Sequence, residues 1–98
     1  MITVVIQDKR IEISGHARFA AYGKDIVCAA CSSIVITSVN NMMSVNQNAI
    51  KYEDDNETLS IEIIKEDELI NKLFNNLKEL LKGLANDYPK NIKIESEE

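Results

Sequence analysis

The sequence predicts a small α+β domain in which a sheet carries two helices, with elements in the order β-β-α-β-β-α-β. Three observations predict this fold. Residues 2–14 and 50–63 contain stretches that alternate between apolar and polar side chains, as half-buried strands do. Between Leu69 and Leu84, apolar residues recur at the three-and-four spacing of an amphipathic helix. The 98-residue length and 45% hydrophobic content suit a single domain, 1–98, with one core.

The first two strands should form a β-hairpin. Ile2, Val4 and Ile6 lie on one face of the opening strand. The polar residues 7–10 have the composition of a turn, and residues 11–14 alternate strictly after it. The two segments are therefore expected to pair.

A loop and then a helix should follow this hairpin. The alternation stops in residues 15–24, so we expect a loop there. Asp25 has the chemistry of a helix N-cap, and the helix should run from Ile26 to about Met43. Its apolar residues lie on several faces, which favours burial against the sheet. The β-branched run 34–37 would fit a strand by propensity alone, which is the competing interpretation.

The second half should repeat the pattern of a hairpin followed by a helix. Residues 50–52 and 59–63 alternate on either side of the polar turn 54–57. The second helix should begin at Glu66 or Asp67 and end before Pro89. Its clear periodicity makes it the best-defined element of the sequence.

The two ends of the chain carry further expectations. Ile92 and Ile94 alternate in a last short strand, and the acidic tail 95–98 should fray. Residues 1–6 lack the basic flank and the cleavage site of a signal peptide. No apolar run approaches the roughly 18 residues that cross a bilayer. We therefore expect a cytoplasmic protein that does not contact the membrane.

The charge of the chain disfavours direct binding to nucleic acid. The formal net charge is −5, and no cluster of Lys and Arg is interleaved with aromatic residues. An acidic surface suits a basic partner. The two cysteines, Cys28 and Cys31, should be thiols because a reducing compartment disfavours structural disulfides.

One pair of residues could support nucleophilic catalysis. His16 is the only histidine, and Cys28 follows it by twelve residues. If Asp25 caps the helix, Cys28 is its third residue, near unpaired N–H groups and the positive end of the helix dipole. Such surroundings favour the thiolate that a cysteine protease needs. His16 would then be the general base, and backbone N–H groups near Cys28 could stabilise an oxyanion.

Each of these residues also has a plain structural interpretation. A lone histidine in a loop is usually solvated, and a cysteine in an apolar helix is usually a small core residue. Asp25 could cap the helix and do nothing else, or it could also orient His16. Ser32 lies one turn after Cys28 and could bond the sulfur or the substrate, or could simply allow close helix packing.

Cys28 and Cys31 also form a C-x-x-C pair, which suggests two alternatives to proteolysis. A zinc site would need further ligands, and the chain has only one histidine and no second cysteine pair. A dithiol redox protein is the second interpretation, although a thioredoxin-like β-α-β context is not predicted. Cys31 is therefore expected to be a small buried residue. A third class is a module that binds a partner protein without catalysis.

The segment around these residues resembles a known family. Gly15-His16-Ala17, Gly23, and Asp25-Ile26-Val27-Cys28-Ala29-Ala30 followed by Ser32 are similar to the ribosomal-processing cysteine protease family, Prp. The motif covers residues 15 to 32, about a fifth of the chain. Cys31 departs from the pattern, since such proteins usually carry an aliphatic residue there.

The resemblance implies a specific function. Members are homodimeric bacterial endopeptidases that remove a hydrophobic N-terminal extension from large-subunit ribosomal protein twenty-seven, cutting after an aromatic residue. By this resemblance Cys28 is the nucleophile and His16 the base, while Asp25 and Ser32 match accessory positions. No cofactor or metal ion is expected. Gly15 and Gly23 would bracket a lid, residues 17–24, that moves aside for the substrate.

Overall fold

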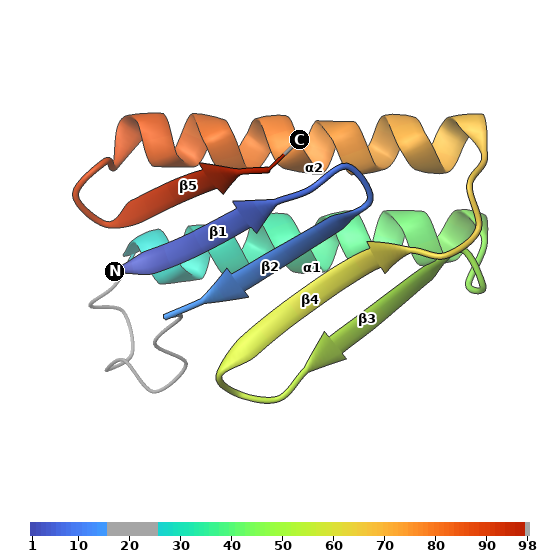
Figure 1. The fold of residues 1–98 in the computed structure, drawn as a ribbon, viewed down its shortest axis with the longest axis horizontal. Coiled ribbons are helices and arrows are strands. Elements are labelled where there is room, and N and C mark those ends of the chain that lie inside the picture. Colours follow the sequence, from blue (N-terminus) through green and yellow to red (C-terminus); the bar gives the residue numbers. More distant parts are fainter. Residues whose placement is uncertain (16–25, 98) are drawn as a thin grey trace.

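A computed structural model describes residues 1–15 and 26–97 and confirms the predicted order of elements (Figure 1). Residues 16–24 of the predicted loop and the capping residue Asp25 lie outside the described residues. The elements are β1 (Ile2–Ile6), β2 (Arg10–Ser14), α1 (Ile26–Val45), β3 (Ile50–Asp54), β4 (Thr58–Ile63), α2 (Glu68–Asp87) and β5 (Ile92–Ser96).

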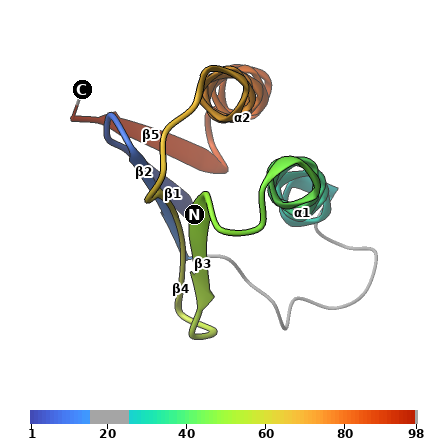
Figure 2. The same cartoon turned by 90° about the vertical axis from the view of Figure 1, so that its right-hand side faces the viewer.

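The five strands form one mixed sheet in the order β3-β4-β2-β1-β5. β1 pairs with β5 in parallel, and the other neighbours pair antiparallel. The register places apolar residues opposite one another, as with Ile11 and Ile61, so one face of the sheet is largely apolar. Both helices cover that face, as the view along the sheet shows (Figure 2). The other face carries ion pairs such as Arg10 with Glu12 and with Glu62.

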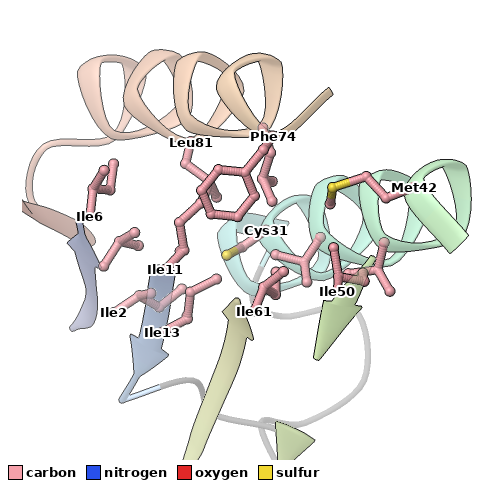
Figure 3. Packing of buried hydrophobic residues seen from close by; sticks show 14 of the residues in the cluster. Ile2, Ile6, Ile11, Ile13, Cys31, Met42, Ile50, Ile61, Phe74 and Leu81 are labelled. Carbon is pink, nitrogen blue, oxygen red and sulfur yellow. The ribbon is translucent and has the colours of Figure 1, made fainter. Parts of the chain in front are cut away.

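The core fills the space between the sheet and the two helices (Figure 3). Phe74 of α2 is its largest fully buried side chain, and Met42 of α1 lies in the same cluster. Ile11 and Ile61 contribute from the middle of the sheet. The two helices also pack against each other, so the position of α1 is fixed from two sides.

Helix α1 is longer than predicted and only partly buried. It continues to Val45, two residues past the expected end, and its twenty residues include no charged side chain. By length and hydropathy it could cross a membrane, contrary to the expectation from the sequence. One side of it packs into the domain core through residues such as Val35 and Met42, and a core helix passes the same compositional test. Its apolar residues are not all buried, because Ile36 on the other side is 54% exposed.

The C-terminal half follows the prediction with one correction. Asp67 caps α2, since its Oδ1 accepts a hydrogen bond from the Ile70 N–H at 2.8 Å. The acidic tail was expected to fray from Glu95, and this is wrong for its first residues. β5 extends to Ser96, and the Glu97 N–H donates to the Ile6 carbonyl at 2.7 Å. Pairing with β1 therefore orders residues whose own pattern does not predict a strand.

Candidate active site

The described residues include only part of the predicted site. Cys28, Ser32 and Gly15 lie within them, whereas His16, Gly23 and Asp25 lie outside. The pairing of Cys28 with His16 therefore stays a prediction.

Cys28 occupies the first turn of α1. It is the third residue of the helix and is 7% exposed. The first N–H groups of a helix have no partner within the helix, and they lie at the positive end of its dipole. The first turn of α1 from Ile26 contains no acidic residue that would oppose this field. These surroundings favour an anion at the Cys28 sulfur.

Cys31 lies one turn further along α1 and is buried more deeply than Cys28. It is 1% exposed and lies among the core side chains between α1 and the sheet (Figure 3). Burial, and secondarily the negative charge of Cys28, raise the pKa of the Cys31 thiol from its ordinary value of 9.0 to about 11. The prediction of a small buried residue at this position is confirmed. The two cysteines are not joined in a disulfide.

A pocket of about 250 Å³ begins beside Ser32, one helical turn after Cys28. It lies between α1 and the sheet, and most of its walls are apolar. The lining residues are Ile13, Cys31, Ser32, Val35, Ile36, Tyr52, Asp54 and Leu59. Its volume is just below that of pockets that hold drug-sized ligands, and it suits one large side chain.

The sheet wall of this pocket was not predicted as part of the site. Tyr52 of β3 lies opposite Ile61 of β4, and Asp54 lies opposite Leu59. Both pairs therefore lie on the face of the sheet that the helices cover. The alternation of Leu59 with Ile61 places Leu59 on the core side. The register between β3 and β4, which adds Tyr52, is visible only in the fold.

Gly15 follows the last residue of β2 and directly precedes His16. Its φ is +71°, a left-handed conformation that favours glycine. A Cβ atom at this position would collide with the backbone carbonyl oxygen of Met1. Glycine is thus required here by the backbone. Its role as one end of a lid stays a prediction.

Two alternatives to proteolysis can be compared with this geometry. Within residues 1–15 and 26–97, no three His, Cys, Asp or Glu side chains are grouped to hold a metal ion. The C-x-x-C pair lies on a helix that follows the antiparallel hairpin of β1 and β2. A thioredoxin-like redox motif is expected near a β-α-β unit instead.

Comparisons of the sequence with a family model and with known proteins point to the same family. The family model described as cysteine protease Prp matches residues 1–93. The ribosomal processing cysteine protease Prp of Mycoplasma pneumoniae is 33% identical in an alignment 100 residues long, and the match covers 99% of this chain and 96% of that protein. Its counterpart in Mycoplasma genitalium is 31% identical over 99 residues, covering 99% and 97%.

A solved structure agrees along the whole chain. The essential ribosomal processing protease Prp from S. aureus, in complex with a covalently linked product peptide, has a TM-score of 0.86. It is 25% identical, and the match covers 99% of this chain and all of that one. The shared fold includes the helix on which Cys28 lies.

Proposed function

This chain belongs to the cysteine protease Prp family, and we propose that Cys28 is its nucleophile and His16 its general base. The observation that carries the proposal is the position of Cys28 in the first turn of α1, directly before an apolar pocket. A thiolate at a helix N-terminus is stabilised by the helix field, and the neighbouring pocket can hold a substrate side chain.

The proposed reaction has two stages. His16 takes the proton of the Cys28 thiol, and the sulfur attacks the scissile carbonyl carbon. N–H groups of the first turn of α1 stabilise the oxyanion, and His16 then protonates the leaving amine. Water activated by His16 hydrolyses the acyl-enzyme and restores the thiol. Asp25 caps α1 in this proposal, and Ser32 borders the substrate pocket.

We propose that the substrate is the N-terminal extension of large-subunit ribosomal protein twenty-seven. The named relatives are ribosomal processing proteases, which supports a ribosomal protein as the substrate. The pocket beside Ser32 suits an aromatic side chain of a hydrophobic extension, because its walls include Val35, Tyr52 and Leu59. The segment between Gly15 and Gly23 would act as the lid that closes over this peptide.

A homodimer through the exposed side of α1 completes the proposal. Six exposed residues recur at alternating spacings of three and four, the spacing of a coiled-coil seam. These seam residues are Ile26, Ala29, Ser33, Ile36, Asn40 and Met43. The seam carries no charge, and a two-fold dimer pairs one patch with the same patch of a second copy. The partner would lie beside the substrate pocket, because Ile36 belongs to both surfaces.

The proposed location is the cytoplasm. The two cysteines are thiols, which suits a reducing compartment. The net charge of −5 disfavours direct contact with ribosomal RNA and leaves the basic ribosomal protein as the partner.

The test is cleavage of a peptide that spans the extension and the start of the mature ribosomal protein. Cys28→Ala and His16→Ala should each abolish cleavage by the full-length protein in reductant. Cys31→Ala should retain most of the cleavage activity, whereas Cys28→Ala should have none. Lys72→Ala, on the exposed side of α2, is the matched control and should cleave normally.

Two results would contradict the proposal. Cleavage that survives Cys28→Ala would exclude Cys28 as the nucleophile. Stoichiometric binding of the peptide without any product would favour a binding module instead.

A further inference from the structure

Cys28 and Cys31 have the backbone geometry that a disulfide requires. Residues three apart in an α-helix have Cα atoms about 5 Å apart, from the helical rise and radius. Disulfides span Cα separations of roughly 4.4 to 6.8 Å. Both side chains belong to the same buried cluster on one side of α1. The negative charge of Cys28 also contributes to the raised pKa of the Cys31 thiol, as expected for neighbouring residues on one helix face.

The position of the pair on the helix makes closure feasible. Cβ atoms three residues apart in a helix are roughly 5–6 Å from each other, whereas a disulfide needs about 3.5–4.5 Å. The backbone must therefore tighten locally. Cys28 is the third residue of α1, and the terminal turns of helices often adopt the tighter 3₁₀ geometry, in which side chains three residues apart lie directly above one another.

The two thiols differ in their reactivity toward oxidants, which is needed if Cys31 is to protect Cys28. Cys28 lies in a field that favours its thiolate, the form that reacts with oxidants. The raised pKa of Cys31, about 11, keeps that thiol protonated and unreactive at neutral pH. Peroxide should therefore attack Cys28 first. Cys31 would react only with an activated sulfur beside it.

We propose that Cys28 and Cys31 form a reversible disulfide that protects the nucleophile from irreversible oxidation, an inference that rests on the proposed role of Cys28. In the first step the Cys28 thiolate attacks hydrogen peroxide. A sulfur–oxygen bond forms, the oxygen–oxygen bond breaks, and the departing hydroxide leaves a sulfenic acid on Cys28.

The second step joins the two residues. The Cys31 sulfur attacks the Cys28 sulfur, the sulfur–sulfur bond forms, and the sulfur–oxygen bond breaks. The departing hydroxide takes the Cys31 proton and leaves as water. Two thiols have then lost two electrons, and one peroxide has been reduced to water. A dithiol reductant returns both residues to thiols by thiol–disulfide exchange.

The disulfide has two functional consequences. It inactivates the protease, because Cys28 can no longer attack a carbonyl carbon. It also prevents further oxidation of Cys28 to sulfinic acid, which ordinary reductants do not reverse. Because closure tightens the first helical turn, the disulfide should be strained and easily reduced.

Intact mass and recovered activity test the proposal on the full-length protein. The wild type is treated with hydrogen peroxide, its remaining thiols are blocked with a maleimide, and its mass is measured. We expect a loss of two hydrogen atoms, no maleimide adduct, and a Cys28–Cys31 crosslink in the peptide map. Dithiothreitol added before the block should restore nearly all of the untreated activity.

Substitutions at each cysteine separate this role from general sensitivity to oxidation. In Cys31→Ala and Cys31→Ser, Cys28 should gain two or three oxygen atoms, and dithiothreitol should recover almost none of each variant's own untreated activity. The serine variant keeps the size of the side chain, so agreement between the two excludes a packing effect. In Cys28→Ala, the Cys31 thiol should remain reduced.

The outcomes distinguish this proposal from the proposed function. A wild-type protein that cleaves the peptide but oxidises directly to sulfinic acid would overturn the disulfide and leave the protease intact. The disulfide would also be overturned if dithiothreitol restored the activity of the peroxide-treated Cys31 variants as completely as that of the wild type. A protein that forms the crosslink but never cleaves the peptide would refute the proposed function alone.

Discussion

The ammonium group of Lys78 donates a hydrogen bond to the backbone carbonyl oxygen of Asp8, 2.9 Å away. Lys78 is 4% exposed, and its ammonium group lies 5.2 Å from the centre of the Phe74 ring. This contact joins the middle of α2 to the turn between β1 and β2. It therefore connects two elements that are far apart in the sequence.

Lys78→Met should lower the free energy of unfolding by about 1–2 kcal/mol. The lost hydrogen bond from a charged donor should outweigh the recovered cost of burying the ammonium group. Chemical denaturation measures the change. Lys72→Met is the control on the same helix, where a 74% exposed side chain forms a surface ion pair with Glu68 and should contribute less than about 0.5 kcal/mol. Equal changes in the two variants would contradict the structural role of Lys78.

Asp67→Ala should destabilise the domain by about 1 kcal/mol. The substitution removes the oxygen that accepts from the Ile70 N–H and leaves the first turn of α2 uncapped. Thermal or chemical unfolding detects this loss. Asp67→Asn keeps an acceptor at the cap and should be close to the wild type. If Asp67→Asn loses as much stability as Asp67→Ala, the effect comes from the charge of Asp67 and not from its hydrogen bond.

The stability of the fold should fall above pH 9 because of Cys31. Its pKa is about 11 in the folded state and 9.0 ordinarily, so the unfolded chain loses this proton first as the pH rises. The contribution is complete below pH 9 and is lost as the pH passes through 11, amounting to about 3 kcal/mol in full. Denaturation of wild type and Cys31→Ala at a series of pH values isolates it. Parallel curves would show that Cys31 makes no such contribution.

Tyr52→Ala should lower kcat/KM for the aromatic-containing peptide by about tenfold, mainly through KM. The substitution removes one wall of the proposed substrate pocket, and such apolar contacts are worth roughly 1–3 kcal/mol. Tyr52 is 37% exposed, so the fold should survive, as circular dichroism can verify. Lys51→Ala changes the neighbouring residue of β3 on the opposite face. If Lys51→Ala lowers kcat/KM as much as Tyr52→Ala does, loss of the pocket wall is not the cause of the decrease.

Met43→Lys should weaken the proposed dimer by at least about tenfold in dissociation constant. A charge in an uncharged seam must be desolvated without a partner when the seam is covered. Sedimentation at several protein concentrations measures the dissociation. Leu69→Lys is the matched control and should leave the dimer unchanged, because Leu69 is an exposed apolar residue on α2, outside the seam. Equal weakening of the dimer by both variants would place the interface elsewhere. A monomeric wild type would exclude the dimer altogether.

The sequence predicts the elements better than it predicts the site. Periodicity located the second helix and the hairpins, because each burial pattern is local to its own segment, whereas the first helix was predicted from the capping chemistry of Asp25 and an apolar run. It did not predict that β5 reaches Ser96, since this extension depends on parallel pairing with β1. The wall that Tyr52 adds to the pocket likewise depends on the register between β3 and β4. The roles of His16 and Asp25 stay predictions.

The parallel pairing of β1 with β5 determines when the sheet can be completed. Ile2 lies opposite Ile92, so the first strand meets its partner only when nearly the whole chain is available. During synthesis, β1 has β2 on one side and an open edge on the other. Such a long-range closure makes folding slow relative to a helical bundle, because the loop entropy is lost before the contact forms. The nascent enzyme should therefore acquire its final sheet only after its last strand has left the ribosome.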